Sequence, residues 1–172
     1  IDSSNLYHAA KKAKWQISLS HLKQLFAQAF DVVCANCYVV VPREGDITRA
    51  GMLAYAKAAS RFFTVKQKPL KYIIDQETER ELKKGDIDLD LSMDVIRMLP
   101  RLDAVVVMSG DSDYLALAAY TKERGIPTVF VSYKDAMAWE LRLSEHLFLE
   151  RIRQSVDLGS AITNPHLAAG AV

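Results

Sequence analysis

Short apolar runs alternate with helical patterns along this chain. The clearest run is Ala104–Met108, which is apolar throughout and ends at Ser109-Gly110. An apolar run this short, bounded by Gly, is typical of a strand buried on both faces of a parallel sheet. Further strands are predicted at Val32–Val41, Phe63–Ile74 and Pro127–Val131. Because strands alternate with helices, the pattern predicts an α/β fold with a mainly parallel sheet and helices on both of its faces.

Capping residues and helical spacing place the helices between these strands. A lysine-rich helix follows the opening loop, Ser18 or Ser20 caps the next helix, and Thr48 opens a third. Asp86–Leu99 alternates like a strand in its first half. It is predicted to be a helix because Pro100 ends it and carboxylates crowd its beginning.

The remaining segments are less regular. Asp75–Gly85 is predicted to be a charged loop or short helix, and Asp135 to cap a helix through Leu143. Leu147–Arg153 is predicted to be a last strand or helix edge. The domain is expected to span residues 1–153, and 154–172 to form a tail that docks loosely or stays disordered.

Two carboxylates follow the central strand in the order Asp111-Ser112-Asp113. Sites in open α/β sheets lie beyond the carboxyl ends of the strands, where these residues fall. Asp111 or Ser112 can serve simply as a helix cap. A cap accounts for one acid but not for two, whose repulsion a hard divalent cation such as Mg²⁺ or Mn²⁺ would offset.

Other segments add acids at equivalent places. Asp2 lies just past the first strand, and Asp88 opens the helix before the central strand, on the face that it shares with Leu91. On the same helical wheel, Asp90 and Asp94 fall on a solvated face. If the first and central strands are neighbours, the inward acids meet in one pocket, as metal-assisted phosphodiester hydrolysis requires. Their crowding is expected to raise the pKa of at least one acid, Asp111 or Asp2.

Composition limits what the chain can bind. Its 172 residues suit one domain. A net charge of +1 predicts that any basic patch that binds nucleic acid covers only part of the surface. Lysines that could guide a nucleic-acid backbone are Lys11, Lys12, Lys83 and Lys84, with Lys66, Lys68 and Lys71 nearby. An ordinary solvated surface is the alternative for each of them.

The two cysteines and the lengths of the apolar runs indicate in which cellular compartment the protein is expected. Cys34 and Cys37 are interpreted as two buried free thiols of a reduced, cytoplasmic protein, rather than as a redox or metal pair. No apolar run is long enough for a membrane span, and no signal peptide is visible. The sequence begins at Ile1 rather than Met, so whether residues precede Ile1 in the protein is left open.

Three segments together resemble a known family: IDSSNLY, KKGDIDLDLSMDVI and VVVMSGDSDYLALAAYTKERGIPTVFV. They are similar to the NYN domain, a group of PIN-like ribonucleases, and to its bacterial LabA-like branch, from Ile1 to about Arg153. The resemblance implies a three-layer α/β/α sandwich and Mg²⁺- or Mn²⁺-dependent cleavage of RNA. It marks Asp2 and Asn5 in the opening motif, Asp88 and Asp94 in the second, and Asp111 and Asp113 at the strand end. His146 stands where the family's closing motif usually has an Asp.

The leading hypothesis is a metal-dependent ribonuclease. Asp2, Asp88 and Asp111 are its expected metal ligands, and Asp113 assists catalysis. The expected supporting residues are Asn5, Asp94 and Ser109. Single-stranded RNA is the expected partner, a homodimer is left open, and no membrane is expected.

Two alternatives remain open. A phosphatase or topoisomerase-primase type of domain also uses Asp-x-Asp after a parallel strand, but Tyr114-Leu115 and the absence of a Glu after Asp2 argue against it. The other is a catalytically silent module of the same fold that binds RNA or a regulatory partner.

Overall fold

The computed structural model describes residues 1–76 and 79–159, and its centre is a set of parallel strands. β1 (Asn36–Val41) pairs with β2 (Thr64–Pro69), and β6 (Thr128–Ser132) pairs with both β5 (Val105–Val107) and β7 (His146–Phe148). The first two residues join these groups. The amide of Tyr38 donates to the carbonyl of Ile1 over 2.9 Å, and the amide of Asp2 donates to the carbonyl of Met108 over 3.1 Å. Asp2 is thereby fixed between β1 and β5.

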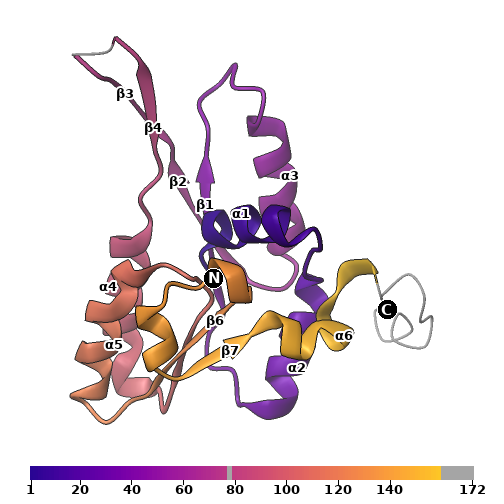
Figure 1. Ribbon diagram of the computed structural model, residues 1–172, viewed down its shortest axis with the longest axis vertical. Helices are drawn as coiled ribbons and strands as arrows, with labels where there is room; N and C mark the ends of the chain where they lie inside the picture. Colours follow the sequence, from indigo (N-terminus) through magenta and orange to yellow (C-terminus); the bar gives the residue numbers. More distant parts are fainter. Residues whose placement is uncertain (77–78, 160–172) are drawn as a thin grey trace.

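Helices cover both faces of these strands (Figure 1). Cys37 and Val39 of β1 belong to one hydrophobic core, together with residues of α1 (Ser3–Ala13), α2 (Leu19–Ala29) and α3 (Arg49–Ala59). Tyr38 and Val40 belong to a second core, with residues of α4 (Asp88–Met98) and α5 (Leu115–Lys122). Successive side chains of a strand point to opposite faces, so β1 is buried on both. The predicted α/β sandwich with a mainly parallel sheet is confirmed.

A two-stranded arm extends from the body of the molecule (Figure 1). It pairs β3 (Lys71–Ile74) with β4 (Glu81–Lys84) in antiparallel register. The prediction of a loop or short helix over Asp75–Gly85 is therefore wrong for its second half. The single strand predicted over Phe63–Ile74 is also interrupted, because β2 ends at Pro69 and the chain begins a new pairing at Lys71.

Segments after β6 replace another predicted helix. Two 3₁₀ turns, η3 (Lys134–Ala136) and η4 (Glu140–Leu143), stand where Asp135 was expected to cap a helix through Leu143. Backbone groups there bind other partners: the amide of Ala138 donates to the carbonyl of Gly110, and Arg142 donates to the carbonyl of Met137. These groups are unavailable to a continuous helix.

The end of the described chain folds against α2. After the 3₁₀ turn η5 (Leu149–Ile152), α6 (Arg153–Val156) contacts α2 and buries Val156 completely. The remaining 3₁₀ turns are η1 (Leu99–Arg101) and η2 (Ser112–Tyr114). Of the predicted tail, residues 160–172 lie outside the described residues.

Several local predictions are confirmed. Ser18 caps α2 and accepts from the amide of His21, Thr48 precedes α3, and Asp88 begins α4. Both cysteines are free thiols, but only Cys37 is buried, so the expectation that Cys34 is buried is wrong. Within the described part of the chain, no helix is both long and apolar enough to cross a membrane.

Candidate metal centre

The end of β5 is held by a glycine that no larger residue could replace. A Cβ on Gly110 would lie 2.2 Å from the carbonyl oxygen of Ala136, far inside van der Waals contact. Gly110 also donates its amide to Oδ1 of Asn5 over 2.8 Å and accepts from the amide of Ala138 over 2.9 Å. Asn5 therefore ties α1 to the strand end, and the residue that follows, Asp111, has a fixed starting point.

Asp111 turns the chain into the next helical segment. Its Oδ1 accepts from the amide of Asp113 over 3.1 Å, so it caps η2. The capping interpretation is correct for Asp111, but it uses only one carboxylate oxygen. The cap also places Asp113 beside Asp111, and both side chains lie at the carboxyl edge of the sheet.

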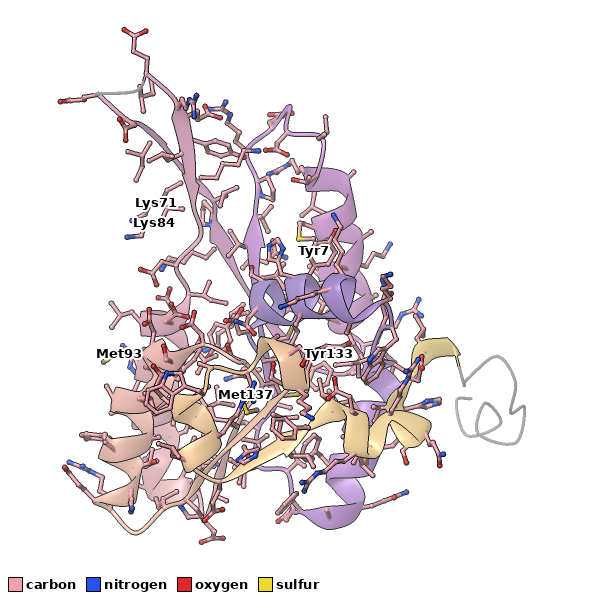
Figure 2. The ribbon with its side chains drawn as sticks, in the orientation of Figure 1. Tyr7, Lys71, Lys84, Met93, Tyr133 and Met137 are labelled. Atoms are coloured by element: carbon pink, nitrogen blue, oxygen red, sulfur yellow. The ribbon has the colours of Figure 1, made fainter. Side chains whose placement is uncertain are left out.

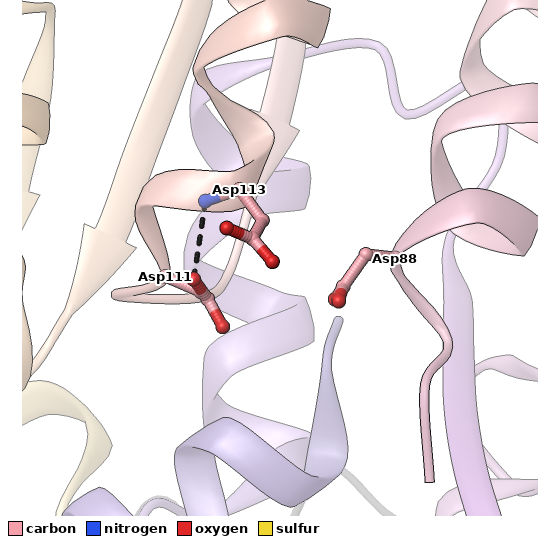
Figure 3. A group of neighbouring side chains, drawn as sticks. All are labelled: Asp88, Asp111 and Asp113. Atoms are coloured by element: carbon pink, nitrogen blue, oxygen red, sulfur yellow. Dashed lines mark hydrogen bonds between the residues drawn. The ribbon is translucent and has the colours of Figure 1, made fainter. Parts of the chain in front are cut away.

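Asp88 completes a cluster of three carboxylates. It begins α4, whose cap residue Ile87 makes no side-chain cap bond. One oxygen from each of Asp88, Asp111 and Asp113 lies within 4.8 Å of the others, and Figure 3 shows the three side chains facing one another across a gap. Two oxygens bound to one Mg²⁺ lie at most about 4.2 Å apart, given bonds of about 2.1 Å. Only one pair of the three can lie that far apart, because neighbouring ligands of an octahedral site lie about 3.0 Å apart, so the carboxylates would have to move closer together to bind one cation.

Asp2 lies beside this cluster and is not one of its three members. Its side chain is buried and caps α1, with Oδ1 accepting from the amide of Asn5 over 3.0 Å. Its Oδ2 accepts from the hydroxyls of Ser109 (3.2 Å) and Tyr114 (3.4 Å). Every expected acid of the opening and strand-end motifs is thus at one edge of the sheet, but Asp2 is enclosed and Asp113 is exposed.

The electrostatics of the cluster follow mainly from burial. Burial raises the pKa of Asp2, and the nearby charge of Asp111 adds a smaller effect in the same direction. Burial also raises the pKa of Asp88, with further contributions from the charges of Asp2 and Asp111. The expected rise for Asp2 is therefore present, but desolvation outweighs the like-charge repulsion that the sequence suggested.

Tyr114 is a site residue that sequence reasoning missed. Its hydroxyl donates to Asp2 and is also within hydrogen-bond reach of Asp88, so Tyr114 lies between the buried acid and the cluster. Burial, and then the charge of Asp2, raise the pKa of Tyr114, which keeps the hydroxyl protonated as a donor. A possible signal was its position three residues after Asp111, where a capped turn brings the side chain back under the acids.

Asp94 does not lie on a solvated face as predicted. Only 16% of its side chain is exposed, and it accepts from the hydroxyl of Tyr38 (2.6 Å) and from Nζ of Lys66 (2.5 Å). The prediction failed because β1 and β2 cover that side of α4, which a single-helix wheel cannot show. Asp90 is exposed as predicted and pairs with Lys68.

The expected RNA-binding lysines are separated. Lys11 and Lys12 are exposed on α1, and Lys12 reaches the carbonyl of Asp135 over 3.4 Å. Lys83 is in an ion pair with Asp46, whereas Lys84 lies opposite Lys71 in the arm.

His146, at the closing motif, is half-buried in β7. Its ring lies against Phe148, and Nδ1 contacts the carbonyl of Ser144 over 2.9 Å. It supplies no carboxylate to the cluster.

Comparisons with known proteins agree with this architecture. The chain is 22% identical over 151 residues to the low amplitude and bright protein LabA of Synechococcus elongatus, covering 87% of this chain and 80% of that protein. An uncharacterised protein of Methanocaldococcus jannaschii is 22% identical over 145 residues, covering 81% of this chain and 58% of that protein.

A crystal structure of a protein of unknown function from Vibrio parahaemolyticus has the same fold. It superposes with a TM-score of 0.64 at 20% identity, over 84% of this chain and 86% of that chain. The family model of the NYN domain matches residues 1–152. This chain is therefore a member of the NYN domain family.

Proposed function

We propose that the chain is a metal-dependent ribonuclease whose centre is the cluster of Asp88, Asp111 and Asp113. The observation that carries the proposal is that no basic side chain of the described residues neutralises these converging carboxylates. Within residues 1–76 and 79–159, no ion pair involves any of the three, although other acids such as Asp46, Asp90 and Asp94 are paired. Carboxylate oxygens are the ligands that Mg²⁺ and Mn²⁺ prefer.

Each residue of the cluster has a distinct part in this proposal. Asp88 and Asp111 are half-buried and would hold the cation, while Asp113 is exposed. Its exposure lets Asp113 accept a proton from an attacking water and release it to solvent. A bound divalent cation supplies water of lowered pKa and neutralises the charge that develops on a phosphodiester.

Four neighbouring residues position the cluster: Asp2, Asn5, Ser109 and Tyr114. Ser109 and Tyr114 hold the Asp2 carboxylate, and Asn5 holds Gly110 next to Asp111. The enclosed charge of Asp2 strengthens the attraction of the pocket for a cation. Membership of the NYN family supports the same chemistry. Single-stranded RNA is the substrate that we propose.

The proposal is tested by cleavage and by metal binding on the same protein. The purified chain should cleave a labelled single-stranded RNA with Mg²⁺ or Mn²⁺, and EDTA should abolish cleavage. Asp111→Asn should lower the rate at least about 100-fold, because a catalytic metal contributes several kcal/mol and 1.36 kcal/mol is a factor of ten. Calorimetric titration with Mn²⁺ should show that the same variant binds the cation more weakly.

Asp103→Asn is the matched control. Asp103 is exposed just before β5, at the opposite end of the strand from Asp111, and the change in charge and volume is identical. It should retain both activity and Mn²⁺ affinity. Equal losses from the two variants would indicate a contaminating nuclease or misfolding. RNA binding without cleavage by any divalent cation would favour the silent module.

A further inference from the structure

The β3–β4 arm has two faces with different surroundings. Residues that pair directly across the antiparallel ladder share a face, and the faces alternate along each strand. The outer face, as we name it, consists of Lys71, Ile73, Leu82 and Lys84. The inner face carries the intervening residues Tyr72, Ile74, Glu81 and Lys83.

The polar and aromatic residues of the inner face bind within the protein, whereas Ile74 on the same face is 70% exposed. Lys83 and the hydroxyl of Tyr72 both bond to Oδ2 of Asp46, over 2.7 and 2.9 Å. Glu81 pairs with Arg43 over 2.7 Å, and the Arg43 guanidinium lies 4.0 Å from the centre of the Tyr72 ring. The loop after β1 therefore uses the charges on this face.

The outer face brings two like charges together. Lys71 is directly opposite Lys84, and Figure 2 shows the two side chains next to each other at the base of the arm. Like charges that face each other across a ladder destabilise it. Neither lysine takes part in an ion pair with the described residues. An anion bound between the two amines would remove the repulsion.

The lysine pair is held close to the carboxylate cluster. Lys84 and Asp88 are four residues apart, so their Cα atoms are separated by at most about 14 Å. The connection is fixed at Gly85, where a Cβ would lie 2.8 Å from Cγ1 of Val40 and 3.1 Å from Cδ1 of Leu70. The base of the arm is therefore packed against β1 within a few nucleotides of the cluster.

We propose that the outer face of the arm binds single-stranded RNA beside the carboxylate cluster, with Lys71 and Lys84 sharing one or two backbone phosphates. The inference rests on the ribonuclease function proposed above and identifies where its substrate is held. Ile73 and Leu82 lie next to the lysines and are 46% and 50% exposed. Unpaired bases offer apolar faces to such residues, whereas a duplex keeps its bases stacked inside.

A second copy of this chain fits the outer face poorly. A two-fold dimer centred on the lysine pair would bring four lysines together at the base of two arms. RNA supplies the opposite charge instead.

The test measures binding of a labelled oligouridylate in EDTA, so that no cleavage occurs, at several salt concentrations. Each phosphate contact to a single strand contributes about −0.7 to the slope of log K against log salt. Lys71→Gln with Lys84→Gln should make the slope shallower by about 0.7 if the lysines share one phosphate and by about 1.4 if they bind two. Relative to 1 M salt, binding at 0.1 M should weaken by about 5-fold or about 25-fold, respectively. Lys57→Gln with Lys122→Gln removes the same charge from exposed lysines in the last turns of α3 and α5 and should leave the slope unchanged.

Lys83→Gln tests whether RNA contacts the outer face or only senses the positive charge of the arm, because Lys83 is next to Lys84 but on the inner face. Its slope should stay close to that of the parent. An unchanged slope in the Lys71/Lys84 double variant, or equal changes in the Lys57/Lys122 variant, would overturn the inference. So would a shift from dimer to monomer in sedimentation with no change in RNA binding, which would make the arm a dimer contact.

Cleavage is measured separately with Mn²⁺. A parent protein that cleaves RNA, together with an unchanged slope in the double variant, would leave the ribonuclease function standing without the arm. A parent that never cleaves, with the predicted change of slope, would instead refute the ribonuclease function and keep the arm as an RNA contact.

Discussion

Removing one charge from the carboxylate cluster should stabilise the apo protein. In Asp111→Asn the amide oxygen can still accept from the amide of Asp113, so the cap of η2 is retained. Two unit charges 4.8 Å apart, the outer limit of the cluster, repel by about 0.9 kcal/mol at the dielectric constant of water. Asp111 faces two such neighbours, and salt screens part of the repulsion. We expect a gain of about 1 kcal/mol, or about 2–4 °C in Tm for a chain of this size.

Mn²⁺ should make the parent protein more stable than Asp111→Asn, the reverse of their order in EDTA. A cation at 100 times its Kd stabilises the parent by about 2.7 kcal/mol, which raises its Tm by about 5–10 °C. Asp111→Asn lacks one charged ligand, so it should gain much less. Thermal unfolding of both proteins in EDTA and in Mn²⁺ gives the comparison, with Asp103→Asn as the control.

Two results would contradict this reasoning. A variant less stable than the parent in EDTA would mean that Asp111 has a structural role that outweighs the repulsion. An equal gain from Mn²⁺ in parent and variant would place the cation elsewhere.

Two further predictions concern the strand end and pH. Gly110→Ala should cost about 2 kcal/mol or more and lower Tm by at least about 4 °C, because its Cβ meets backbone; Gly51→Ala, within α3 and with nothing within 4 Å, should be neutral or stabilising. Asp2 and Asp88 have raised pKa values, so the folded apo protein keeps protons that the unfolded chain has lost. Their contribution to stability should therefore fall as pH rises from about 4 and level off above the raised pKa values. Unfolding across pH in EDTA should show a smaller fall for Asp88→Asn, and a parent equal to this variant at every pH would contradict the assignment.

The sequence was sufficient where the structure depends on local patterns. The strand before Ser109, the turn at Gly110 and the helix beginning at Asp88 each follow from a short stretch of apolar spacing, a glycine or a following proline. Their residues lie where the patterns placed them, and three of the expected acids form the cluster. Whether the first residues of the chain lie beside the central strand was left open by the sequence, and the backbone bonds of Asp2 and Tyr38 place them there.

The sequence was insufficient where contacts join distant segments. In the arm Ile73 pairs with Leu82, nine residues later in the chain, and neither strand is long enough to show a clear alternation. Asp94 is covered by Tyr38 and Lys66, which come from strands 56 and 28 residues away. Burial of Asp2 beneath Ser109 and Tyr114 likewise depends on the packing of β5 against the first residues of the chain. These features could be stated only once the strands were placed side by side.

The distribution of charge around α4 links the proposed centre to the arm. Lys84 and Asp88 carry opposite charges within four residues, and each lies in a group of like charges, yet no ion pair joins the two groups in the described chain. Between the two groups, Gly85 packs so tightly against Val40 and Leu70 that a Cβ there would lie 2.8 Å from Val40, which fixes the chain between the arm and α4. A divalent cation at the carboxylates and a phosphate at the lysines would satisfy both groups. RNA bound with its metal supplies these two charges together, which is why we regard the unpaired acids and the unpaired lysines as parts of one binding surface.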